Sequence, residues 1–180
     1  MRIYKILIIG FLFTLIGCNS TKIHPDDNSW KVIRVANIEL KYPAELTERP
    51  SADDHRIIDN DNDRNDLDHP QEYRIEITPQ IETCSTSTLQ ELDSHTRPIL
   101  ELKETANPSN DILTIRGVQR PTGPEVEMSE ENLKEWWSYQ DTRYLFCSEH
   151  AGKSVVIVIA QKTDDPKLAN DIFDSFRWTK

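Results

Sequence analysis

The chain has 180 residues, with 21 Lys and Arg against 31 Asp and Glu, which gives a net charge of −10 at pH 7. Proteins that bind nucleic acid or anionic lipid headgroups do so with clustered Lys and Arg, which replace counterions. The acidic balance therefore excludes nucleic acid as a principal partner. A chain of this length is the size of one ordinary domain and can bury a substantial core.

The first 17 residues have the layout of a secretory signal. Arg2 and Lys5 precede an apolar run from Ile6 to Ile16, which is the order typical of export signals. The run is too short to span a bilayer as a mature helix. The segment Leu15-Ile16-Gly17-Cys18 resembles the lipobox of bacterial lipoproteins, which implies that Cys18 receives a diacylglycerol before cleavage. The alternative is an ordinary cleaved signal in which Cys18 is incidental.

Removal of residues 1–17 takes away two basic residues and no acid, so the mature chain has 163 residues and a net charge of −12. Several acyl chains on one cysteine make a permanent anchor, since each buried methylene contributes about 0.8 kcal/mol. In the lipoprotein pattern, Asn19 after the lipidated cysteine implies delivery to the outer membrane of a Gram-negative cell, facing the periplasm. Residues 18–29 are polar and predict a flexible tether.

A single globular domain is predicted for residues 30–180. Residues 30–35 and 38–43 alternate apolar and polar side chains, which predicts two half-buried strands. Residues 53–68 contain seven aspartates and almost nothing apolar, which neither a strand nor a helix interior favours. We therefore predict an acidic loop over 53–70, followed by a third strand at 73–78.

Two arrangements are open around Pro98. Ser87 and Gln90 form a plausible capping box, and an apolar helical face is supplied by Leu89, Leu92, Ile99 and Leu100. Because proline is poorly tolerated inside a helix, either the helix kinks at Pro98 or it ends earlier and the residues after Pro98 form a short strand.

The second half of the chain predicts three more strands and two helices. Residues 112–118 read as a strand, and Ser129 can cap a short acidic helix. Residues 143–147 and 154–160 predict a hairpin whose second strand is apolar on both faces and therefore central. A last helix begins where Asp165 precedes proline, and its apolar residues share one stripe: Leu168, Ile172, Phe173 and Phe176.

The segment from Cys147 to Trp178, with Ile38–Pro43 and Thr114–Gly117, resembles the PsbP-like and DcrB-like sandwich of small bacterial lipoproteins. The resemblance implies an α+β fold in which an antiparallel sheet is flanked by helices in an α/β/α sandwich. It also implies a role in binding proteins or supporting envelope complexes, and not in catalysis. The acidic loop and the Trp136-Trp137 segment depart from the family pattern.

Cys84 and Cys147 are the two cysteines that remain after Cys18. An even pair in an oxidising compartment is interpreted first as a disulfide, and a loop of that length could stabilise the fold by about 4 kcal/mol. The alternative is two buried, unpaired thiols.

The acidic loop contains the one candidate cation site. Asp61, Asp63, Asn65 and Glu72 match positions one, three, five and twelve of a calcium loop. The position that favours glycine holds Asp66, and no helices flank the loop, so a solvated acidic loop is the competing interpretation. The histidines show no metal-ligand spacing: His24, His55, His69, His95 and His150.

Trp136 and Trp137 are the candidate partner-binding residues. Adjacent tryptophans on a helix point to different faces, so one of them is expected to reach the surface, where it can anchor an interface. In the alternative, one ring packs in the core and the other covers it.

No nucleophile elbow or glycine-rich phosphate loop is present in the sequence.

The first functional hypothesis is a lipid-anchored binding protein without catalytic activity, whose partner is another envelope protein. The second is an immunity-type lipoprotein that neutralises a toxin acting in the periplasm, with its acidic surface complementing a basic effector. The third, an envelope hydrolase, lacks any recognisable catalytic set.

Overall fold

The computed structural model describes residues 29–50, 54–60, 73–80, 83–91, 98–107, 111–124, 127–138 and 140–179. Within these ranges the chain forms ten strands and three helices. Every strand pairing between them is antiparallel. The expected mixture of an antiparallel sheet with a few helices is therefore confirmed.

The larger sheet has seven strands, and its central strand is the apolar one predicted near the C-terminus. Its order is β3 (Thr47–Pro50), β4 (Arg56–Asp59), β5 (Tyr73–Gln80), β9 (Lys153–Gln161), β8 (Thr142–His150), β7 (Ile112–Gln119) and β6 (Leu100–Asn107). The hairpin between β8 and β9 turns at Ala151 and Gly152, which both have positive φ. Glycine adopts that conformation without strain, which explains its place in the turn.

A smaller sheet of three strands is formed by β1 (Trp30–Val35), β2 (Ile38–Pro43) and β10 (Arg177–Trp178). The first two have the predicted bounds. Ile33 and Leu40 are register partners and are both buried, whereas their neighbours Val32 and Lys41 are exposed. The alternation therefore turns one face of the small sheet toward the core and the other toward solvent.

The three helices are α1 (Thr86–Glu91), α2 (Glu130–Ser138) and α3 (Pro166–Ser175). The start of α3 is as predicted, because the Asp165 side chain accepts a hydrogen bond from the backbone N–H of Leu168 at 3.1 Å. The predicted cap of α1 is wrong. Ser85, and not Ser87, accepts from the backbone N–H of Thr88 at 3.0 Å, because the helix begins two residues earlier than the capping box implied.

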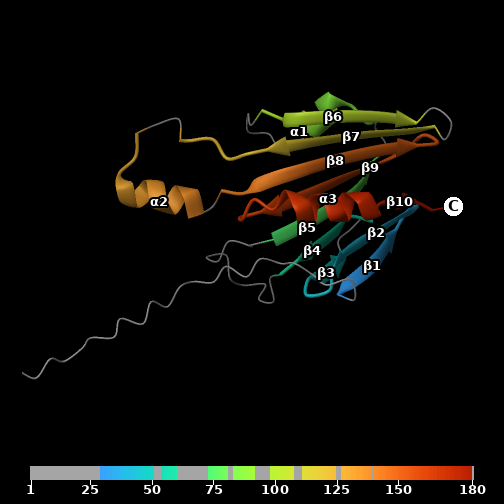
Figure 1. Cartoon of the computed structure of the whole chain (residues 1–180), viewed down its shortest axis with the longest axis horizontal. Coiled ribbons are helices and arrows are strands. Elements are labelled where there is room, and N and C mark those ends of the chain that lie inside the picture. Colours follow the sequence, from blue (N-terminus) through green and yellow to red (C-terminus); the bar gives the residue numbers. More distant parts are fainter. Residues whose placement is uncertain are drawn as a thin grey trace, which may run out of the picture.

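The large sheet has a hydrophobic core on each face. On one face, Phe146 and Ile157 pack with the small sheet and with the buried stripe of α3. On the other face, Leu145 and Val156 pack with Leu89 of α1 and with the two cysteines. Figure 1 shows α3 lying over β8 and β9 beside β2 and β1. Two of the helices therefore cover opposite faces of one sheet.

The prediction of a continuous acidic loop over 53–70 is wrong in part, because β4 occupies Arg56–Asp59. Ile58 is completely buried, and the carboxylate of Asp59 lies 3.1 Å from the guanidinium of Arg49 on β3. Burial of the Ile58 side chain stabilises β4, and the ion pair with Arg49 offsets the cost of burying the Asp59 carboxylate. Residues 61–70 lie outside the described part of the chain.

Of the two arrangements around Pro98, the structure has the strand. β6 begins at Leu100, two residues after the proline, and pairs along β7 with a bulge between Leu100 and Lys103. None of the helices in the described ranges has both the length and the apolar content needed to cross a bilayer.

Candidate functional site: the α2 arm

Residues 127–138, here called the α2 arm, lie in the connection between β7, which ends at Gln119, and β8, which begins at Thr142. The helix begins where predicted, because Ser129 accepts hydrogen bonds from Asn132 N–H through its side chain at 3.3 Å and from Leu133 N–H through its carbonyl at 2.8 Å. Glu130 and Glu131 occupy the first turn, where negative charge interacts favourably with the helix dipole. Local chemistry thus accounts for a short helix at this place.

The apolar residues of α2 share one stripe. Leu133, Trp136 and Trp137 stand at positions i, i+3 and i+4, which keeps them within about 100° of arc on an α-helix. Leu133 and Trp136 are half-buried, and the Trp137 side chain lies outside the described part of the chain. The opposite face is charged, so the arm is an amphipathic helix.

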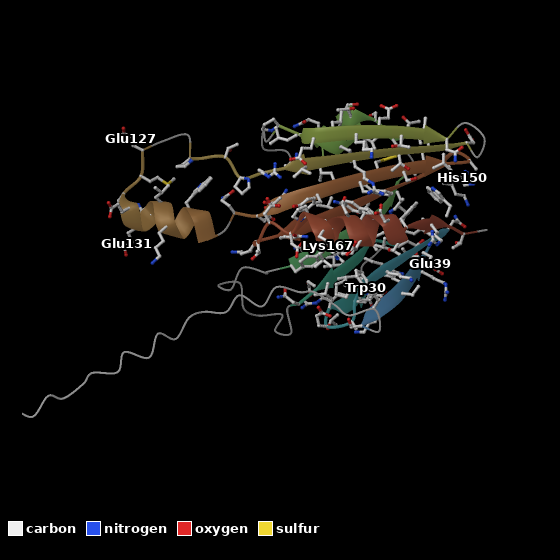
Figure 2. The ribbon with its side chains drawn as sticks, viewed as in Figure 1. Trp30, Glu39, Glu127, Glu131, His150 and Lys167 are labelled. Atoms are coloured by element: carbon white, nitrogen blue, oxygen red, sulfur yellow. A yellow bond between two sulfur atoms is a disulfide. The ribbon has the colours of Figure 1, made fainter. Side chains whose placement is uncertain are left out.

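Leu133 and Trp136 belong to neither hydrophobic core of the described residues. Neither Leu133 nor Trp136 is among the residues that form or border the two hydrophobic clusters of the described chain. Figure 1 shows α2 standing away from the end of the large sheet, joined to it by extended chain. Figure 2 shows Glu127 and Glu131 on opposite sides of the arm. The side chain of Trp137 lies outside the described residues, so both interpretations of the tryptophan pair stay predictions.

A network of charged and phenolic side chains fixes the base of the arm. Arg120, the first residue after β7, contacts Glu101 Oε1 at 2.7 Å through Nη1 and Asp164 Oδ2 at 3.4 Å through Nε. Tyr144 of β8 donates a hydrogen bond to the same Asp164 carboxylate. Residues before and after the arm are thus joined to β6 and to the segment before α3.

The Tyr144 phenol in this network stays protonated. Burial raises the pKa of Tyr144 well above its ordinary value, and the hydrogen bond to Asp164 and the negative charge of that carboxylate raise this pKa further. A protonated phenol keeps its donor at neutral pH, so Tyr144 holds Asp164 in place for Arg120. The network therefore joins the residues on both sides of the arm.

After Arg120 the chain runs toward the arm as Pro121, Thr122, Gly123 and Pro124, without helix or strand. Each proline has a fixed φ and no N–H to donate, which favours an extended, stiff connection. Residues 121–124 therefore form a short, stiff segment after Arg120, which makes two ion pairs.

The structure separates the other predicted site residues from the arm. Cys84 and Cys147 lie at disulfide distance, with Cα atoms 5.8 Å apart, on the face of the sheet that α1 covers. Cys18 and the calcium set Asp61, Asp63, Asn65 and Glu72 lie outside the described residues. Within the part that is described, no group of three or more His, Cys, Asp or Glu gathers into a metal-binding cluster.

The base network was missed by sequence reasoning. Arg120, Glu101 and Asp164 come from three segments that are distant in sequence, and nothing in their local patterns distinguishes them from other surface charges. Only the order of strands in the sheet brings β6, β7 and the segment before α3 to the same end.

Comparisons with known proteins give no family assignment. No model of a known protein family matches the chain, and no curated protein matches it significantly.

Proposed function

We propose that this protein is a lipid-anchored binding protein of the cell envelope, without catalytic activity, that docks a protein partner through the α2 arm. One observation carries the proposal: Leu133 and Trp136 of α2 lie outside both hydrophobic cores of the described residues. A leucine and a tryptophan on one stripe of an acidic helix outside the cores are candidate contacts for another molecule.

The spacing of the stripe fits the helix-in-groove mode of recognition. Leu133, Trp136 and Trp137 at i, i+3 and i+4 match the anchor positions of amphipathic helices that lie in apolar grooves. Tryptophan is also among the residues that contribute most to binding energy at interfaces. The partner surface is therefore expected to contain an apolar groove wide enough for an indole ring.

The acidic residues around the apolar stripe of α2 indicate which charges the rim of the partner's groove should have. Glu127, Glu130 and Glu131 are exposed on the arm, and the chain as a whole is acidic. A groove bordered by Lys and Arg complements them, which speeds association and disfavours acidic competitors. The proposed partner is accordingly a protein with a basic-rimmed apolar groove.

The remaining parts of the proposal rest on the sequence. Cys18 is proposed as the lipidated residue, with the protein on the outer membrane facing the periplasm. The resemblance to PsbP-like and DcrB-like sandwiches agrees with a binding role and with two helices on opposite faces of the sheet. Calcium at Asp61, Asp63, Asn65 and Glu72 stays a weak-binding prediction.

The docking proposal is tested by affinity capture from envelope extract. Wild-type protein is compared with Trp136→Ala and with Leu102→Ala, a matched control because Leu102 is 45% exposed but lies on β6. One partner that is retained by wild type and Leu102→Ala and lost by Trp136→Ala supports docking through the arm. Equal recovery by all three proteins contradicts it.

The identity of that partner separates the two binding functions. A projecting acidic arm is suited to entering the cleft of a basic enzyme, which is the observation that favours an immunity-type lipoprotein as the second candidate. A captured secreted enzyme that is inhibited at one-to-one stoichiometry selects this candidate, whereas a resident envelope complex selects the support role.

The lipid anchor is tested separately by Cys18→Ser. If Cys18 carries the lipid, the variant leaves the membrane fraction while the wild type stays in it. Retention of the variant in the membrane fraction contradicts the anchor and leaves the arm proposal untouched.

A further inference from the structure

An open groove runs between α3 and the solvent-facing side of the small sheet, on elements that do not include the arm. Its volume is about 620 Å³, which lies within the range of ligand sites in proteins. The small sheet contributes Trp30, Val32 and Lys41 to its lining. Figure 2 labels Trp30 on β1 and Lys167 on α3, which belong to the two walls.

Local structure explains why these side chains face the groove. Val32 and Lys41 are register partners on adjacent strands, so they stand side by side on the face opposite the core. On α3, Lys167, Asp171 and Asp174 recur at i, i+4 and i+7 and are exposed, while the stripe on the other side of the helix is buried. One wall is therefore a polar helical stripe, and the other combines an aromatic ring, an aliphatic residue and an ammonium group.

The charges of the groove cancel. Two ammonium groups, Lys41 and Lys167, stand against two carboxylates, Asp171 and Asp174. Lys167 Nζ lies 2.8 Å from Asp171 Oδ2, and Asp174 Oδ1 lies 2.8 Å from Arg116 Nη2. The two aspartates repel a phosphate or carboxylate ligand, and the two lysines repel a cationic ligand. The composition thus favours an uncharged ligand that both donates and accepts hydrogen bonds.

The aromatic residue adds a second requirement. Trp30 is half-buried and packs against the main hydrophobic cluster while also lining the groove. A ring supported in this way offers a fixed apolar surface at low entropic cost.

The hydroxyl group of Ser175, which also lines the groove, is engaged in hydrogen bonds within the protein. It accepts from Lys41 N–H at 2.9 Å and donates to the Ile172 carbonyl at 2.6 Å.

From these features we infer that the groove binds an uncharged oligosaccharide. The C–H face of a sugar ring stacks on Trp30, and its hydroxyl groups accept from the lysines and donate to Asp171 and Asp174. The Lys41 backbone N–H is bonded to Ser175, so it is not available for an extended peptide to add as a strand. This inference does not rest on the arm.

The purified protein is titrated with neutral tetramers of N-acetylglucosamine, of glucose and of galactose, and the indole N–H resonances are followed by NMR. At least one tetramer is expected to shift the Trp30 signal saturably at concentrations below about 10 mM. The Trp178 and Trp136 signals serve as internal references outside the groove.

Two variants test the assignment to this groove. Trp30→Ala is expected to weaken binding about tenfold or more, and Asp171→Asn, on the exposed face of α3, to weaken it severalfold without affecting the fold. Trp136→Ala should bind the sugar as wild type does. Absence of a Trp30 shift with all three tetramers overturns the inference, and so does binding by Asp171→Asn that equals wild type.

Discussion

At the residue scale, Gly117 shows how closely β6 and β7 approach on the side of the smaller core. A Cβ atom at this position would lie 2.4 Å from Ile99 Cγ2, and Ile99 packs against the cluster that contains the two cysteines. We expect Gly117→Ala to lower the free energy of unfolding by about 1–3 kcal/mol because Ile99 must move. Guanidinium unfolding measures this change, with Gly123→Ala as the control, since nothing lies within 4 Å of the added atom there. Equal stability of the two variants contradicts the account.

The second residue-scale prediction concerns Tyr73, whose phenol is buried near Gln161. Burial raises the pKa of Tyr73 far above its ordinary value, and the charge of Asp165 raises it further, against a hydrogen bond from Gln161 that lowers it. Above pH 10 the unfolded chain therefore loses the phenolic proton while the folded chain keeps it.

Below pH 10 the Tyr73 phenol should therefore have no effect on the free energy of unfolding. Above pH 10 this free energy should fall by about 1.4 kcal/mol per pH unit for each tyrosine that stays protonated in the folded chain. Urea unfolding at several alkaline pH values should show a smaller slope for Tyr73→Phe than for wild type. An unchanged slope shows that Tyr73 ionises normally in the folded protein.

At the element scale, the account requires α2 to contribute little to the stability of the fold. The double variant Leu133→Ala/Trp136→Ala is expected to change the free energy of unfolding by less than about 1 kcal/mol, although such truncations in a core cost about 2–5 kcal/mol. Leu168→Ala on α3 is the matched control, because Leu168 is buried against the sheet. A loss in the double variant as large as in Leu168→Ala places α2 in the core.

Elements with strong local signals could be predicted from the sequence. Alternation located β1 and β2, and the Asp165-Pro166 start with an apolar stripe located α3. β4 was missed because the cost of burying Asp59 is offset by Arg49 on another strand, a pairing that no local pattern contains. The tryptophans of α2 were recognised as candidates, but an amphipathic pattern shows that an apolar face exists and not what covers it.

At the scale of the whole molecule, Cys84 and Cys147 connect the segment before α1 to β8 across 63 residues of sequence. If the pair is oxidised, replacing both by serine should lower the free energy of unfolding by about 4 kcal/mol, because the unfolded chain regains the entropy of an open loop. Denaturation of the double variant against wild type measures the difference. A loss below about 1 kcal/mol, or reactive thiols in the folded wild type, contradicts the disulfide.

The topology also explains why the candidate site could be predicted only in part. The arm leaves the sheet between β7 and β8, at the end where Glu101 and Asp164 meet Arg120. These residues come together only after the seven strands take their order, so sequence spacing contains no sign of the network. Likewise Trp30 and Lys167 form one groove because α3 packs against the small sheet.

The most direct test of the central claim is the dissociation constant between the captured partner and the purified protein, measured for wild type, Trp136→Ala and Leu102→Ala. The account predicts that Trp136→Ala weakens binding by about 2 kcal/mol or more, as expected for an interface anchor, while Leu102→Ala binds as wild type and all three proteins unfold at similar denaturant concentrations. Equal affinity of Trp136→Ala and wild type would show that the partner is bound elsewhere on the domain.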